Sequence, residues 1–312
     1  MAHNSNVDVE LGLMRQELNL RDLAHRDLLH TTAWRPVLDI LTDWVVVLAC
    51  CVAAHQWGAW IAPLCVLVIG NRQRALGNIL HDAAHRTLSG NRRLNDAIAV
   101  ALVAPALLAD LSQYRRTHAR HHAMLGDALR DPDYVQPLGP RHQWLRTYLG
   151  LLMQPKSWWA SFIGHLGCDM PALRLVYLVG WWAAATAALA ALGGWNVALV
   201  SVILWFLARA TTFHAITAFR ELCDHFGMSP GGIFSFTRDI ATASSLRWLI
   251  HPYNNGYHLT HHLLPAVPYY NLARAHARCL DTPSFCKHAL ICDSYFGNER
   301  SVIRREPHVV LA

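Results

Sequence analysis

Histidine is the residue type in this sequence best suited to chemistry. It accounts for 20 of 312 residues, and eight of these fall in three short clusters. The clusters are His81-Asp82-Ala83-Ala84-His85, His118-Ala119-Arg120-His121-His122 and His258-Leu259-Thr260-His261-His262. Residues three and four apart share one face of a helix, so each cluster predicts a helix that aims two or three imidazoles at one point. Converging imidazoles are typical of a transition-metal site.

The number of imidazoles predicts more than one metal ion. A zinc site takes about four ligands, so eight or nine histidines are too many for one zinc and suit two ions, each with an open position. The ninth candidate is His225, just past the last apolar run. Imidazole binds iron, zinc, copper and nickel, so ligand type alone does not identify the metal. Two irons can activate O2, and a membrane location favours an apolar substrate.

Membrane spans are the elements that must position these clusters. The charged fraction is only 15%, against roughly 25% in soluble domains, and residues 44–70 and 175–208 contain no Asp, Glu, Lys or Arg. Turn signals interrupt both runs, at Gln56-Trp57-Gly58 and Gly193-Gly194-Trp195. We therefore predict two hairpins of transmembrane helices, with spans at residues 37–55, 60–81, 173–192 and 196–213.

The side of the membrane follows from parity and charge. Four spans place both termini and the region between the hairpins on one side, and the arginines there make that side cytoplasmic. All three clusters then lie on the cytoplasmic side. A further apolar stretch, Ala97–Ala109, is too short to span and contains Pro105, so we expect it to be interfacial or re-entrant. The net charge of +6 suits an anionic membrane face, and we expect no nucleic-acid partner.

Three motifs carry a family resemblance: HDAAH, YRRTHARHH followed by GDALRDPD, and NNGYHLTHHLLPAVPYYNL. Together they make residues 70–272 similar to the membrane-bound fatty acid desaturase and hydroxylase superfamily. The resemblance implies an all-α integral membrane fold, with about four transmembrane helices in two hairpins and a cytosolic helical cap that holds two non-haem irons. It also implies O2-dependent attack on an unactivated C–H bond of a fatty acyl or related lipid-like substrate, giving an alkene or an alcohol. The implied metal ligands are His81, His85, His118, His121, His122, His225, His258, His261 and His262.

Several polar residues are candidates for supporting contacts to these histidines. Glu221 falls where the family often has a polar residue near the metal, so it could bind directly or through water, and Asp224 is the competing carboxylate. Asp82 and Asn255 are further candidates, because a metal-binding histidine normally needs a partner for its second nitrogen. The Asp131-Pro132-Asp133 segment predicts a fixed turn beneath the second cluster.

Arg74 and Asn78 lie on the same helical stripe as His81 and His85. One interpretation is that they bind a polar group of the substrate. The alternative, which we favour, is that Arg74 forms a salt bridge with Asp82 or Asp224 and so helps to orient a ligand histidine.

The whole chain is expected to form a single desaturase-like domain. Its segments are a cap at 1–36, the first hairpin at 37–85, a cytosolic region at 86–172, the second hairpin at 173–213 and a cytosolic region at 214–312. No HPGG haem-binding segment and no Cys cluster is present, so we expect electrons from a separate ferredoxin-, rubredoxin- or cytochrome b5-like protein with its reductase. The short cap favours a bacterial-type enzyme in the inner membrane.

Two other classes of protein compete with the oxidase. In a His-rich metal transporter the binding site would lie near the bilayer midplane between broken helices, whereas these clusters lie at cytoplasmic helix ends. A zinc-dependent membrane hydrolase would need fewer histidines and a catalytic carboxylate, and its HExxH motif is absent from the sequence.

Overall fold

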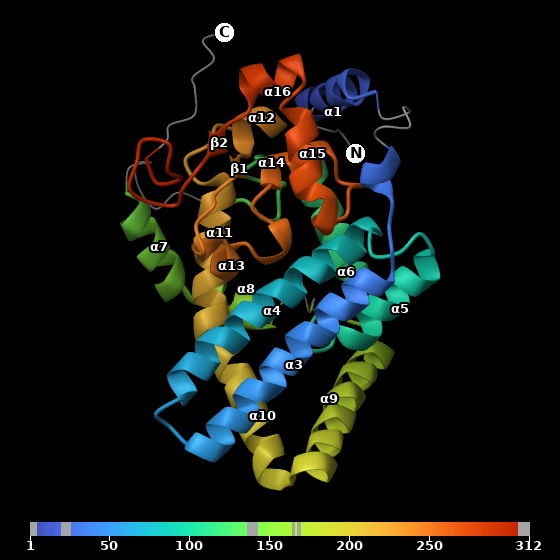
Figure 1. The fold of residues 1–312 in the computed structure, drawn as a ribbon, viewed down its shortest axis with the longest axis vertical. Helices are drawn as coiled ribbons and strands as arrows, with labels where there is room; N and C mark the ends of the chain where they lie inside the picture. Colours follow the sequence, from blue (N-terminus) through green and yellow to red (C-terminus); the bar gives the residue numbers. More distant parts are fainter. Residues whose placement is uncertain (1–4, 20–25, 136–142, 164–165, 167–169, 305–312) are drawn as a thin grey trace. The chain divides into compact units, whose positions relative to one another are not determined.

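The protein forms two compact, mostly helical units, each built from separate stretches of the chain (Figure 1). A computed structural model describes residues 5–19, 26–135, 143–163, 166 and 170–304. Unit 1 contains residues 1–31, 115–150 and 219–312, and unit 2 contains residues 32–114 and 151–218.

Unit 2 contains the long apolar helices. Its elements are α3 (Trp34–Trp57), α4 (Ala62–His85), α5 (Arg92–Leu102), α8 (Pro155–Ile163), α9 (Ala172–Gly193), α10 (Trp195–Ala208) and the π-helix η2 (Arg209–Phe213). Helices α3, α4 and α10 pack side by side, and α9 packs against α10 (Figure 1).

Unit 1 is built from shorter elements. They are α1 (Ser5–Glu17), η1 (Asp27–Leu29), α12 (Ile233–Phe236), β1 (Asp239–Ile240), α13 (Leu246–Ile250), η3 (Pro252–Asn254), α14 (His258–Leu263), η4 (Tyr269–Asn271), α15 (Leu272–Cys279), α16 (Pro283–His288) and β2 (Ile291–Cys292). The two strands pair in parallel, and α1 packs on α12, α14 and α16. The chain passes between the units within α6 (Leu111–Ala123), α7 (Trp144–Met153) and α11 (His214–His225).

Both predicted turns are present in unit 2. Gly58 follows α3 with φ +79°, and its N–H donates to the Ala54 carbonyl. Gly194 separates α9 from α10 with φ +85°, and its N–H donates to the Ala190 carbonyl. Both glycines occupy the left-handed region, which a side chain disfavours, so each ends its helix where the sequence predicts a turn.

Three helices among the described residues are long and apolar enough to cross a membrane. They are Trp34–Trp57, Ala172–Gly193 and Trp195–His225, the last of which runs through α10, η2 and α11. The other predicted span forms the 24-residue helix α4 but lies outside this set. Its polar residues have partners within unit 2, since Arg72 pairs with Asp43 at 2.9 Å and Gln73 donates to the Trp205 carbonyl. The four-span count therefore stays a prediction.

The stretch Ala97–Ala109 leaves helical geometry at its centre, and its carbonyl groups are bonded by side chains. Helix α5 ends at Leu102, and Leu108 has φ +52°. Six carbonyls accept hydrogen bonds of 2.8–3.2 Å from donors elsewhere in unit 2. Trp44, Tyr177, Trp181, Trp182, Trp205 and Arg209 donate to the carbonyls of Leu102, Val100, Ala101, Pro105, Ala106 and Leu107, respectively. Irregular backbone can therefore lie among apolar helices without unpaired carbonyls.

Replacing one of these donors tests their contribution to stability. Trp205 is 3% exposed, and Trp205→Phe keeps a ring but removes the N–H that the Ala106 carbonyl accepts. We expect the free energy of unfolding to fall by about 1–3 kcal/mol, because a buried acceptor is left unsatisfied. Thermal unfolding in detergent measures the change. Trp195→Phe is the matched control, since Trp195 is 74% exposed, and an equal loss in both variants would contradict the prediction.

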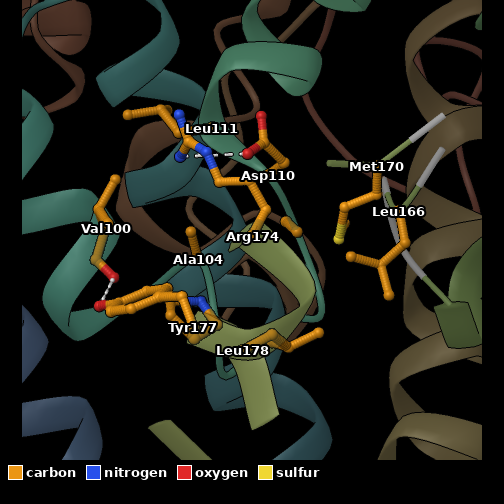
Figure 2. A pocket seen from close by; sticks show the side chains of 11 residues that line it. Val100, Ala104, Asp110, Leu111, Leu166, Met170, Arg174, Tyr177 and Leu178 are labelled. Carbon is orange, nitrogen blue, oxygen red and sulfur yellow. Dashed lines mark hydrogen bonds and ion pairs between the residues drawn. The ribbon is translucent and has the colours of Figure 1, made fainter. Parts of the chain in front are cut away.

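Contacts in unit 2 also hold the helices that carry the first two histidine motifs. A Cβ on Gly70 of α4 would lie 2.1 Å from Thr212 Oγ1 of η2, so only glycine permits this close packing. At the start of α6, Asp110 accepts from the Gln113 N–H at 2.8 Å and caps the first turn. Figure 2 shows Arg174 reaching Asp110, at 3.2 Å, beside a pocket whose other walls are mainly apolar.

Candidate metal centre

Seven histidines of unit 1 converge in two groups. Group A contains His118, His122 and His261, and group B contains His121, His225, His258 and His262. Within each group the potential ligand nitrogens all lie within 4.8 Å of one another. All four members of group B are buried.

The spacing of the two HxxHH motifs explains this division. His118 and His122 are four residues apart on α6, so both point to group A, while His121 is rotated toward group B. Helix α14 does the reverse, since His258 and His262 point to group B and His261 points to group A. Each three-histidine motif therefore aims two imidazoles at one group, as expected, and its middle histidine at the other, because positions i+3 and i+4 lie on opposite sides of position i around the helix.

The ring nitrogens face one another closely. In group B, His258 Nε2 lies 2.9 Å from His225 Nε2 and 3.1 Å from His262 Nε2. In group A, His122 Nε2 lies 3.0 Å from His118 Nε2 and 3.2 Å from His261 Nε2. A single N–H hydrogen can bridge only one pair of ring nitrogens, so it cannot account for a nitrogen that has two close nitrogen neighbours. A metal cation bound by the lone pairs of all three nitrogens matches this arrangement better.

Acceptors behind two of the rings fix which nitrogen carries the hydrogen. His121 Nδ1 lies 2.7 Å from Asp131 Oδ1, and His225 Nδ1 lies 3.0 Å from the Phe236 carbonyl oxygen. A carbonyl or a carboxylate only accepts, so Nδ1–H donates and Nε2 presents its lone pair to group B in the neutral ring.

Burial favours the neutral, ligating form of other members of group B. It holds the pKa of His258 and of His262 well below the ordinary histidine range. For His121, burial alone would lower the pKa, but the hydrogen bond to Asp131 and the charges of Asp133 and Asp131 outweigh it and raise the pKa.

The turn predicted beneath the second motif supplies the acceptor for His121. Asp131 also accepts from the Gly126 and Asp133 N–H groups at 2.9 Å each. Gly126 has φ +77°, and a Cβ there would lie 3.0 Å from the Phe236 ring. Asp133 Oδ2 is farther from His121 Nδ1, at 3.9 Å.

The two carboxylates proposed near the last span both pair with Arg220. Asp224 is fully buried, pairs with Arg220 at 2.6 Å and has Oδ2 3.7 Å from His258 Nδ1. Glu221 pairs with Arg220 at 2.6 Å. Among the described residues, neither carboxylate belongs to group A or group B. Asn255 is 7% exposed and lies between η3 and α14.

The first motif lies at the end of α4 in unit 2. The rings of His81 and His85 are 5.0 Å apart, centroid to centroid. Asp82 Oδ1 is 3.4 Å from His81 Nδ1, and Asp82 Oδ2 accepts from the Thr87 hydroxyl at 2.9 Å. Arg74 and Asn78 lie about two turns and one turn before His81 on α4. Arg74 Nη2 donates to Asn78 Oδ1 at 2.5 Å, and both residues are buried.

Asp239 has a role for which the sequence has no signal. Its carboxylate accepts from the Thr260 N–H at 3.0 Å, from the Thr260 hydroxyl and from His276 Nδ1 at 2.7 Å. Thr260 lies inside the third motif, so Asp239 anchors α14 to strand β1. Asp239 and Thr260 are 21 residues apart, and no local pattern links them.

Comparison with known proteins adds independent information. The family model described as "Fatty acid desaturase" matches residues 59–291, well over half of the chain. The dihydrorhizobitoxine desaturase of Bradyrhizobium elkanii is 29% identical over 269 residues, which are 80% of this chain and 76% of the relative.

Two further relatives are matched over smaller shares of their length. The chloroplastic omega-3 fatty acid desaturase of Ricinus communis is 24% identical over 277 residues, 78% of this chain and 58% of the relative. Beta-carotene 4-ketolase 3 of Haematococcus lacustris is 30% identical over 104 residues, 31% of this chain and 32% of the relative.

Proposed function

This chain belongs to the fatty acid desaturase family, and from that premise we propose that it is a di-iron enzyme that desaturates or hydroxylates an unactivated C–H position. Membership makes it an oxidoreductase that acts on a lipid-like substrate, and its apolar helices make it a membrane protein.

The convergence of Nε2 atoms in groups A and B is the observation that carries the proposal. Seven imidazoles in two adjoining sets, six of them on α6 and α14 and the seventh on α11, match two metal ions better than one. We propose that His81 and His85 add two ligands to the three of group A, which completes the nine-histidine set. Two irons held there would supply the activation of O2 and the removal of hydrogen from carbon.

The other polar residues are proposed to orient the ligands. Asp82, Asp131 and Asp224 each lie beside the Nδ1 side of a ligand ring, where a carboxylate fixes the ring and strengthens the opposite nitrogen as a donor. Glu221 and Asn255 are proposed to bind a metal directly or through water. Because Arg74 and Asn78 bond to each other, we propose that they support α4 behind the first motif, with substrate binding as the alternative role.

We also propose a substrate class, an electron donor and the side of the membrane that the metal site faces. The named relatives are a dihydrorhizobitoxine desaturase, a fatty acid desaturase and a β-carotene ketolase, so we propose a fatty acyl or related lipid-like substrate. We propose that a separate ferredoxin-, rubredoxin- or cytochrome b5-like protein with its reductase supplies electrons. The metal site is proposed to face the cytoplasm of a bacterial inner membrane.

Metal content and product chemistry test this function. Iron-loaded protein purified in detergent is expected to hold about two irons per chain. Lipids from cells that express the protein under isotopically labelled O2 should contain a product that has lost two hydrogens, or one that has gained a single labelled oxygen. One zinc per chain, without either product, would point instead to a hydrolase or a transporter.

A further inference from the structure

We propose that His251 and Tyr295 are positioning residues for the metal ligand His258 and act on it through Asp224. This inference rests on the proposed function, because it concerns one ligand of the proposed centre. Tyr295, His251 and Asp224 form a hydrogen-bonded series inside unit 1 that ends in an ion-pair contact between Asp224 and His258, and all four side chains are at most 4% exposed.

The series begins at Tyr295. Its hydroxyl lies 2.9 Å from His251 Nδ1, and the other ring nitrogen, His251 Nε2, lies 3.2 Å from Asp224 Oδ1. Asp224 Oδ2 pairs with Arg220 at 2.6 Å and lies 3.7 Å from His258 Nδ1. Asp224 therefore stands between two imidazoles, one of which points its Nε2 into group B.

The donors and acceptors in this series can be assigned from their chemistry. Burial raises the pKa of Tyr295, so its hydroxyl keeps its hydrogen and can donate to His251 Nδ1. A neutral His251 then carries its own hydrogen on Nε2, which faces the Asp224 carboxylate. Tyr295 thus selects the His251 tautomer that can donate to Asp224.

A hydrogen bond with His251 and an ion pair with Arg220 fix where the charge of Asp224 lies. His251 holds Oδ1 and Arg220 holds Oδ2, so the carboxylate cannot rotate away from His258 without losing one of them. A carboxylate beside Nδ1 orients the ring and makes Nε2 a stronger donor to a metal. The loss of His251 would free one oxygen and let the carboxylate turn.

The outer end of the series reaches a surface pocket of unit 1. His251 and Tyr295 line this pocket together with Arg247, Trp248 and Tyr257. Trp248 is 60% exposed, and the Arg247 guanidinium lies 4.8 Å from its ring centroid. The space left by a slightly smaller side chain at residue Tyr295 therefore adjoins this pocket and is not a closed cavity.

Three variants separate positioning from a general structural role. Tyr295→Phe removes one hydroxyl, His251→Leu removes both nitrogens, and His251→Gln keeps an N–H that can donate to Asp224. Tyr270→Phe is the matched control, because it removes a hydroxyl that donates to the His30 carbonyl at 3.3 Å elsewhere in unit 1. The measurements are anaerobic titration with Fe(II) alone and Mössbauer spectroscopy, which reports the two irons separately.

We expect His251→Leu to bind one of the two irons about 10–100-fold more weakly, and His251→Gln to restore most of that affinity. Tyr295→Phe should keep both irons while the spectrum of one changes, and Tyr270→Phe should match the wild type. The spectrum of His262→Ala identifies which iron belongs to group B.

The inference is overturned if the wild type holds two irons and Tyr295→Phe and His251→Gln are spectroscopically unchanged, even where His251→Leu fails to fold. It is overturned equally if folded His251→Leu binds both irons as the wild type does. A wild-type chain that binds no iron would be a different result, because it would overturn the proposed function itself.

Discussion

His262→Ala is expected to abolish turnover and to empty one of the two proposed metal sites. His262 is 1% exposed, and its Nε2 lies 3.1 Å from that of His258. Its ring also stacks on the His122 ring of group A, with centroids 4.2 Å apart, so the substitution also removes a contact between the two groups. A bound metal contributes several kcal/mol to such a reaction, so turnover should fall by roughly a thousandfold or more.

Metal analysis of the purified variant and product formation in cells measure this effect. His121→Ala should behave in the same way, since His121 lies in the same group. His30→Ala is the control, because His30 is exposed and only its backbone carbonyl accepts the Tyr270 hydroxyl. Retained turnover in either group B variant would refute the ligand assignment.

Asp239→Ala is expected to have the largest effect on stability. Asp239 is fully buried and accepts hydrogen bonds from Thr260 and His276. Its removal takes the carboxylate acceptor away from three buried donors, which costs about 3–5 kcal/mol in the free energy of unfolding. Because Thr260 lies in α14, the variant should also lose iron affinity before it unfolds.

Thermal unfolding and Fe(II) titration of the same preparation test both consequences. Asp281→Ala provides the control, since Asp281 is an exposed carboxylate of unit 1. An Asp239→Ala variant that melts within about 1 °C of the wild type would show that the anchor contributes little.

Local patterns in the sequence predicted the two turns, the long apolar helices and the helices that carry the histidine motifs, but not the supporting contacts. The turns at Gly58 and Gly194 follow from glycine beside apolar runs, and helices carry the three motifs because their spacing is helical. The motif at His118–His122 could not be divided between two groups from sequence, since that division depends on where α14 and α11 lie.

Contacts between distant residues explain the remaining differences. Asp239 with His276 and His251 with Tyr295 join positions 37 and 44 residues apart, and each pair consists of residue types that are common on any surface. Arg72 of α4 likewise pairs with Asp43, which lies 29 residues earlier on α3. Such pairings become visible only once the helices are placed side by side.

The carbonyl-rich stretch between Val100 and Leu107 has a consequence for the order in which the protein is made. Of its six donors, only Trp44 precedes it in the chain, and the others follow 77–102 residues later. A ribosome adds about 5–20 residues per second, so those carbonyls wait roughly 4–20 s for their partners. Until α9 and α10 emerge from the ribosome, most of the carbonyls in this stretch lack the side-chain donors that let it pack among apolar helices. Synthesis of α9, α10 and η2 thus supplies the side-chain donors that this earlier stretch needs.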